Sequence, residues 1–364
     1  MKGNAKTALK VALLVAAIGG LFIALREPRH LLTLERPTKL VPRLLFSLTR
    51  YPGGVSFRDM AICVKDVNFS PDGRRLVTSG PDERLWVELK VWDASTGQKQ
   101  LTVKETSRYG VTVAFSTDGK YLVGPSWGRT VKMWDANSGQ ELMTFQGHVG
   151  EVLSVAVCQD GKRVASVAAG VTISNLPPAT KLWDVASGLE TLTLKDTNVQ
   201  SVAFSPDGKH LASVGYSSSD ITLWDTTTGQ EVLTLKGHTA TPRSVEFSKD
   251  GKRMASVGLN FDSPTEVKLW DVASGKTLPL SLKGDVGRST CMALSPDGNR
   301  IAFECRSDIK VWDVASGEAV LTLKGYRGGV GCLRFSPDGT RLVSVALVGK
   351  AVDLWDVTTR TGGK

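Results

Sequence analysis

Seven Trp-Asp pairs recur along the chain at intervals of 41 to 49 residues, and they restrict its fold more than any other feature. A period of this length is typical of propeller blades or of a solenoid. The residues before each pair alternate between apolar and polar, as in Val267-Lys268-Leu269-Trp270, which predicts a half-buried strand. The pairs are Trp92-Asp93, Trp134-Asp135, Trp183-Asp184, Trp224-Asp225, Trp270-Asp271, Trp312-Asp313 and Trp355-Asp356.

Two turn signals accompany each pair. An Asp-Gly dipeptide lies 15 to 23 residues before every tryptophan, and this dipeptide supplies the positive φ values that a tight hairpin needs. Apolar stretches flank it on both sides, as around Asp207-Gly208. A second turn, a Gly preceded by Ser or Thr, follows five residues after each of the first six tryptophans. Each repeat is therefore predicted to contain four antiparallel strands.

Four meandering strands with Trp-Asp at the end of the third closely resemble the WD40 repeat family. The resemblance covers residues 42–364 and implies an all-β fold, a seven-bladed β-propeller with a central channel. The Trp and Asp residues of the seven pairs then have a structural role. One monomeric propeller domain also replaces the two domains that a length of 364 residues would suggest.

The resemblance further implies a buried hydrogen-bond relay in each blade, and here the relay is incomplete. Its hydroxyl is present in five blades, but Gly124 and Phe303 replace it in the second and sixth. Its histidine occurs only at His148 and His238, and its aspartate, six residues before the tryptophan, is missing from every blade. The five hydroxyls belong to Thr78, Ser166, Ser213, Ser256 and Ser344.

The last repeat is too short to form its own fourth strand. Only eight residues follow Trp355-Asp356, and an open ring would leave an unpaired sheet edge. Residues 44–51 read like the fourth strands of the other repeats, such as Val232 to Gly237. We therefore expect residues 44–51 to complete blade seven.

The N-terminal segment has a different character. Residues 11–25 carry no charge and follow Lys2, Lys6 and Lys10. A spanning helix needs about 17 to 25 apolar residues and a signal-peptide core about 7 to 15. Residues 1–26 are therefore predicted to be a hydrophobic helix that acts as a membrane anchor or a signal sequence. We favour an uncleaved single-pass anchor through residues 8–25, because the small residues that signal cleavage are poorly placed.

Residues 27–41 are predicted to link this anchor to the propeller. The basic tail before the apolar run favours an extracytoplasmic propeller, although basic residues flank both sides of the run. Secretion after signal cleavage and a cytosol-facing propeller are the alternatives. The formal net charge of +9 is concentrated here, since residues 1–40 carry seven basic and two acidic side chains. No nucleic-acid partner is therefore expected.

The sequence offers little for catalysis. The nucleophile-elbow pattern Gly124-Pro125-Ser126-Trp127-Gly128 falls between two strands of a blade, whereas that chemistry needs a strand, a turn and a helix. We expect no enzyme activity, no cofactor and no metal site. The five cysteines, Cys63, Cys158, Cys291, Cys305 and Cys332, are expected to be buried thiols. Cys291 and Cys305 flank one hairpin, so a disulfide between them is an alternative.

Binding is expected on the loops that join the second strand to the third and one blade to the next. The length of these loops varies, and exposed aromatic and arginine side chains are enriched in binding hot spots. The candidate partner-binding residues are Trp86, Tyr109, Trp127, Tyr216, Phe261, Tyr326 and Arg327.

Three functions follow from these features. The first is a membrane-anchored, non-catalytic scaffold that binds an unknown protein partner. The second is an extracytoplasmic propeller that binds a ligand or carbohydrate or acts as an enzyme, which would need a polar cluster in the central channel. The third is a cytosol-facing regulatory module.

Overall fold

The computed structural model describes residues 44–47, 64–81, 87–107, 112–170, 178–194, 199–215, 218–259, 265–283, 287, 289, 291–306, 308–324, 329–346 and 352–358. All of them belong to one compact unit, Val41–Lys364. The predicted N-terminal helix lies outside the described residues. Within the described part of the chain, no helix is long and apolar enough to span a membrane.

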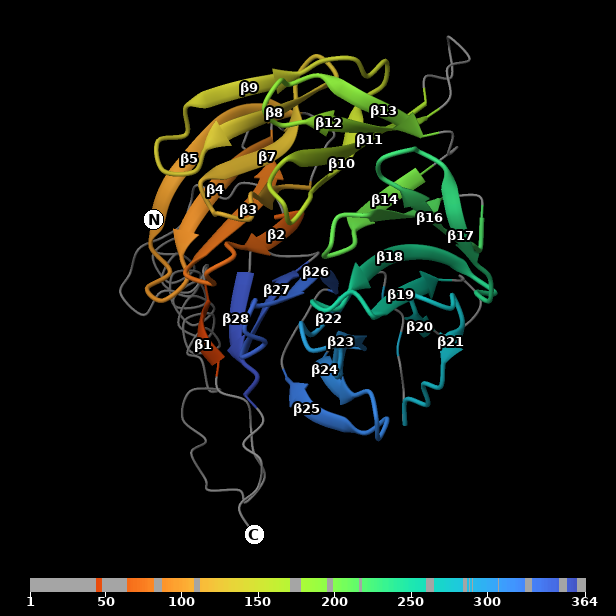
Figure 1. Ribbon diagram of the computed structural model, residues 1–364. Coiled ribbons are helices and arrows are strands. Elements are labelled where there is room, and N and C mark those ends of the chain that lie inside the picture. The colour runs from red at the N-terminus through yellow and green to blue at the C-terminus, as the bar shows by residue number, and fades with distance from the viewer. Residues whose placement is uncertain are drawn as a thin grey trace, which may run out of the picture. The chain divides into compact units, whose positions relative to one another are not determined.

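The described chain forms seven antiparallel sheets of four strands each, which confirms the predicted seven-bladed β-propeller (Figure 1). Blade 1 contains β2 (Asp66–Phe69), β3 (Arg75–Pro81), β4 (Val87–Asp93) and β5 (Lys99–Ser107). Blade 2 contains β6 (Ala114–Phe115), β7 (Tyr121–Ser126), β8 (Thr130–Asp135) and β9 (Glu141–Phe145). Blade 3 contains β10 (Val152–Val157), β11 (Arg163–Ala168), β12 (Ala179–Asp184) and β13 (Glu190–Leu194).

The remaining blades repeat this order. Blade 4 contains β14 (Val199–Phe204), β15 (His210–Gly215), β16 (Ile221–Asp225) and β17 (Glu231–Leu235). Blade 5 contains β18 (Thr241–Phe247), β19 (Arg253–Leu259), β20 (Glu266–Asp271) and β21 (Thr277–Leu278). Blade 6 contains β22 (Met292–Leu294), β23 (Arg300–Cys305), β24 (Asp308–Asp313) and β25 (Ala319–Leu323). Blade 7 contains β26 (Val330–Phe335), β27 (Arg341–Ala346), β28 (Val352–Asp356) and, from the other end of the chain, β1 (Leu44–Ser47).

Residues 44–47 of the predicted closing segment 44–51 complete blade 7, whereas residues 48–51 lie outside the described residues. Strand β1 pairs antiparallel with β28, with Ser47 opposite Asp353. The first strand of each blade lies innermost and contacts the first strands of both neighbouring blades, so that β26 meets β2 (Figure 1). The N-terminal strand therefore supplies the outer edge of the last sheet.

A buried hydrogen bond links the tryptophan of the third strand to the second strand in five blades. The indole Nε1 of Trp270 donates to Ser256 Oγ at 2.7 Å, and the equivalent bond forms in four other blades at 2.7 to 2.9 Å. Blade 6 lacks the hydroxyl, and there Phe303 stacks on Trp312 with ring centroids 4.0 Å apart. The Trp312 Nε1 has no hydrogen-bond partner, which leaves a buried donor unsatisfied. The other four pairs join Trp92 to Thr78, Trp183 to Ser166, Trp224 to Ser213 and Trp355 to Ser344.

The two histidines extend the relay differently. In blade 5, His238 Nε2 contacts Ser256 Oγ at 2.6 Å, and its Nδ1 contacts Glu266 Oε2 at 2.8 Å. Glu266, four residues before Trp270, therefore takes the place of the missing aspartate. In blade 3, His148 Nε2 contacts Ser166 Oγ at 2.6 Å, but its Nδ1 has no partner. Ala179 occupies the position in blade 3 that corresponds to Glu266.

Arginines at the start of the second strands fasten neighbouring blades to each other. Arg300 of blade 6 donates to the carbonyl oxygen of Gly339 in blade 7 at 2.7 Å and lies over the ring of Phe335, 5.4 Å from its centroid. Arg341 makes the same contacts from blade 7 with Gly73 and Phe69 of blade 1. Arg75, Arg163 and Arg253 also reach the next blade, whereas Tyr121 and His210 stand at this position in blades 2 and 4.

Strand β1 gives a first prediction. Deleting residues 1–51 should lower the free energy of unfolding of the propeller by about 3 to 5 kcal/mol, because the backbone hydrogen bonds between β1 and β28 are lost. Deleting residues 1–36 should leave that free energy nearly unchanged. Chemical denaturation of both variants measures the difference, and equal effects would contradict the closure.

Burial of His148 gives a second prediction. Desolvation, with a smaller contribution from Lys181, lowers the pKa of His148 to about 4. The unfolded chain, with a histidine pKa of about 6.5, therefore binds a proton between pH 6.5 and 4 that the folded chain does not. The neutral, buried His148 therefore favours the folded chain fully above pH 6.5, and this advantage is lost as the pH falls toward 4. Because of His148, the free energy of unfolding should fall by about 2 kcal/mol when the pH is lowered from 7 to 5.

Denaturant titrations at pH 7 and pH 5 measure this loss. His148→Gln keeps a polar group near Ser166 but has no imidazole, so its profile should be flatter than that of the unsubstituted chain by that amount. Superimposable profiles would refute the assignment.

Candidate functional site

The most exposed aromatic side chain of the described residues is Trp127, at the tip of the hairpin between β7 and β8. Its side chain is 59% exposed, although Trp is usually largely buried. The turn is tight, since Ser126 pairs with Thr130, and Gly128 and Arg129 have φ values of 77° and 63°. Thr130 Oγ1 donates to the Trp127 carbonyl oxygen at 2.8 Å. The fold therefore presents an indole on a well-defined turn.

This hairpin joins the second strand of blade 2 to the third, so it lies on the face predicted to bind. Of the seven candidate residues, only Trp127 is within the described part of the chain. Trp86, Tyr109, Tyr216, Phe261, Tyr326 and Arg327 lie outside the described residues. The hairpin also carries the Gly-Pro-Ser-Trp-Gly pattern, and the buried Ser126 Oγ there has no hydrogen-bond partner.

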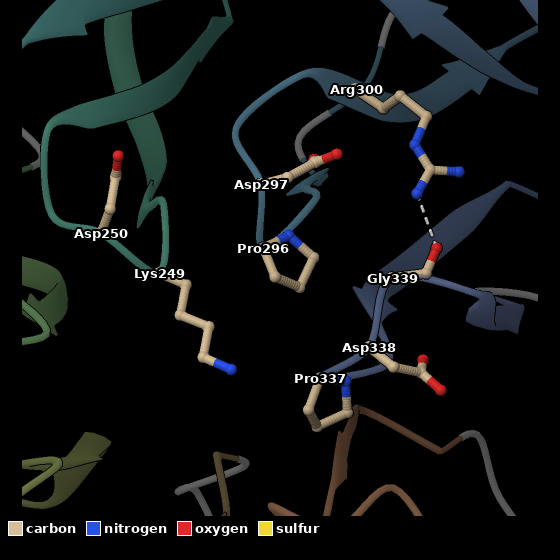
Figure 2. A pocket seen from close by; sticks show the side chains of 8 residues that line it. All are labelled: Lys249, Asp250, Pro296, Asp297, Arg300, Pro337, Asp338 and Gly339. Carbon is tan, nitrogen blue, oxygen red and sulfur yellow. Dashed lines mark hydrogen bonds between the residues drawn. The ribbon is translucent and has the colours of Figure 1, made fainter.

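A pocket of about 490 Å³ opens on the opposite face, between the Asp-Gly turns of blades 5, 6 and 7 (Figure 2). Figure 2 shows the Lys249 side chain extending from its turn into the space between the three turns, whereas Arg300 reaches the Gly339 carbonyl oxygen. The sequence prediction placed no site on this face. The lining residues are Lys249, Asp250, Pro296, Asp297, Arg300, Pro337, Asp338 and Gly339.

The pocket carboxylates are committed to their own turns. Asp250 Oδ1 accepts a hydrogen bond from Ser248 Oγ at 2.7 Å and another from the Lys252 amide, and these bonds lower the pKa of Asp250. Burial of Asp338 acts in the opposite direction, but hydrogen bonds from Ser336 and Thr340 outweigh it and lower the pKa of Asp338. The three aspartates thus remain anionic and hold the turns, while the Lys249 amine has no ion-pair partner among the described residues.

A charged cluster bridges the inner strands. Arg334 on β26 approaches Glu246 Oε1 on β18 at 3.1 Å, as an ion pair outside hydrogen-bond alignment, and lies 3.8 Å from Asp66 Oδ1 on β2. Its Nε donates to Asn68 Oδ1 at 3.2 Å. Glu246 Oε2 accepts from the Leu294 amide at 2.8 Å, so four blades share one network.

Burial raises the pKa of Glu246, and the nearby Arg334 guanidinium only partly offsets this effect. Such a cluster is the feature that a ligand-binding channel would need, but its groups bind one another here. This mutual pairing fits a structural role for the cluster.

An alignment of the repeats could have revealed both sets of residues. At the register of Glu246 and Arg334, four other blades have alanine, at Ala114, Ala156, Ala203 and Ala293. The small side chains leave room for a long arginine to reach across the inner strands. Four blades likewise have proline where Lys249 stands, at Pro71, Pro206, Pro296 and Pro337. These departures from the repeat pattern are the signal in the sequence for both sets of residues.

The alternative disulfide between Cys291 and Cys305 is wrong. Both residues are reduced, buried thiols. Met292 pairs with Phe303, so Cys291 falls opposite Glu304 and is one residue out of register with Cys305. A shift by one residue places two side chains on opposite faces of a sheet, and the two cysteines accordingly belong to different core clusters. Cys158 and Cys332 are also buried thiols, and Cys63 lies outside the described residues.

Comparison with known protein families supports the fold. Residues 98–135 and 139–170 match the family described as WD domain, G-beta repeat. Residues 189–364 match the family described as lipoprotein LpqB beta-propeller domain. No curated protein matches the chain. The two matches divide one continuous series of blades between two propeller families.

The charged cluster gives a third prediction. Arg334→Met should lower the free energy of unfolding by about 2 kcal/mol, because it leaves the partly buried Glu246 without its cation. The double variant Arg334→Met, Glu246→Met should recover at least half of that loss, since no buried charge is then left unpaired between these two positions. Denaturant unfolding of the two single variants and the double variant measures the coupling, and simple additivity would disprove it.

Proposed function

The chain is a seven-bladed β-propeller with WD40 repeats, and from that premise we propose that it is a non-catalytic scaffold that binds a protein partner. The single observation that carries this proposal is the exposed Trp127 on its tight hairpin. Trp buries a large area at a small cost in side-chain entropy, which is why it is enriched in hot spots. The neighbouring Arg129 is also exposed and adds a second residue type that hot spots favour.

The remaining candidate residues extend this proposed surface. Trp86, Tyr109, Tyr216, Phe261, Tyr326 and Arg327 all fall in loops of the same two kinds in the repeat pattern. A rigid ring with variable loops can present several such side chains to one partner.

We also propose that residues 1–26 anchor the propeller to a membrane and that the propeller faces the extracytoplasmic side. Support comes from the uncharged residues 11–25 behind a basic tail. It also comes from the similarity of residues 189–364 to a propeller domain that is described as part of a lipoprotein. The partner would then be another extracytoplasmic or membrane protein.

Small-ligand binding is the second candidate function, and the pocket beside Lys249 is the observation that favours it. The Lys249 amine, which has no ion-pair partner among the described residues, projects between three ordered turns and is suited to hydrogen-bond a polar group on a ligand. This pocket lies on the face opposite Trp127, so the two candidates can be separated by substitution.

Co-purification of the tagged full chain from detergent-solubilised membranes tests the proposal. Trp127→Ala should reduce recovery of the partner at least tenfold, because loss of a hot-spot Trp costs about 2 kcal/mol or more. The melting temperature should stay the same, since the side chain is mostly exposed.

Two control variants sharpen this experiment. Leu189→Ser removes an apolar side chain that is 67% exposed elsewhere on the propeller, and it should leave recovery intact. Lys249→Ala alters the opposite face and should also leave recovery intact. If Trp127→Ala leaves recovery of the partner unchanged, the hairpin is not a hot spot. If only Lys249→Ala reduces recovery of the partner, the binding site is the pocket.

A further inference from the structure

Two buried cysteines occupy equivalent positions on the inner strands of adjacent blades. Cys291 directly precedes β22 of blade 6, and Cys332 lies on β26 of blade 7. Their side chains are buried in the same core cluster, with residue exposures of 8% and 4%. Strands β22 and β26 contact each other along this boundary.

The hydrogen bonds of these residues place the two thiols close together. The amide N of Leu333 donates to Cys291 Sγ at 2.9 Å. That amide N is about 2.4 Å from the Cα of Cys332, because only the carbonyl carbon separates them. Cys291 Sγ therefore lies within roughly 5.3 Å of the Cys332 Cα, so the two cysteines are direct neighbours across the boundary between blades 6 and 7.

We propose that Cys291 and Cys332 form a disulfide bond that links blades 6 and 7 when the chain meets a disulfide-bearing oxidant. The thiolate of one cysteine attacks the external disulfide, forms a mixed disulfide and releases one donor thiol. The second cysteine then attacks the sulfur of the first and releases the other donor thiol. One S–S bond forms and one breaks, two electrons pass to the donor, and both cysteine protons end on the donor thiols.

The surroundings of Cys332 determine when this reaction takes place. Its Sγ lies 3.2 Å from Asp66 Oδ1, and the neighbouring Cys291 thiol, together with burial, raises the pKa of the Cys332 thiol. A raised pKa and low exposure disfavour the reactive thiolate in the folded ring. The bond therefore forms mainly while the propeller folds, before blades 6 and 7 close over the two sulfurs.

The test uses the full chain, refolded from denaturant in a buffer of reduced and oxidised glutathione. Trypsin cleaves after Arg and Lys, and it places Cys291 in peptide 289–300, Cys305 in peptide 301–306 and Cys332 in peptide 328–334. Mass spectrometry without reduction should show peptide 289–300 joined to peptide 328–334. The oxidised chain should also melt about 5 °C higher than the same sample after reduction.

Two variants act as matched controls. Cys332→Ser should abolish the linked peptide and the reductant-sensitive shift in melting temperature, whereas Cys305→Ser should retain both. Recovery of Cys291 and Cys332 only as free thiols, or a link between peptides 289–300 and 301–306, would overturn the proposal. The readout is independent of partner binding and of membrane anchoring, so it stands or falls separately from the proposed function.

Discussion

The contact between first strands of neighbouring blades is the interaction on which the rest of this propeller depends. Each blade is a four-stranded sheet whose faces must be covered, and only its neighbours can cover them. In addition, side chains at equivalent positions of two first strands each accept a hydrogen bond from a backbone amide of the next blade. Asp66 accepts from Val113 at 3.1 Å, and Thr112 accepts from Val155 at 2.8 Å. The arginine contacts between turns repeat this fastening at the Asp-Gly face. The Trp relays order five of the blades internally, but the contacts between first strands hold the ring.

The sequence was sufficient to predict what depends on contacts within one repeat. The strands, the Asp-Gly turns, the Trp relay and even the closure by residues 44–47 follow from spacings that recur seven times. Glu266 was not predicted as a relay member, because it reaches His238 from a position two residues later than the expected aspartate. The Arg334 cluster and the Cys291 and Cys332 pair were also missed, since their members are 41 or more residues apart and meet only through the ring.

Departures from the repeat pattern have two different physical meanings in this chain. In blade 6, Phe303 replaces the relay hydroxyl and compensates with a stacked ring, so the change repacks a core position. At Lys249, a charged side chain replaces a proline on a turn and projects into the space between the turns, with its amide donating to the Pro296 carbonyl oxygen at 2.8 Å. The first departure alters packing without reaching the surface, whereas the second changes what the surface offers. Only departures of the second kind bear on binding.

The extra polar contacts converge on β26, and the topology gives a reason. Blade 7 is built from both ends of the domain, so its sheet is complete only after a loop of roughly 300 residues has closed, which is entropically costly. Strand β26 compensates from the inside: Arg334 binds Glu246 of blade 5 and Asn68 of blade 1, and the Val330 amide donates to Glu304 of blade 6 at 2.9 Å. Cys332 adds a contact with Asp66, and the neighbouring Leu333 amide donates to Cys291 Sγ of blade 6. These contacts do not involve β1, so they can hold blade 7 in the ring before the N-terminal strand pairs with β28.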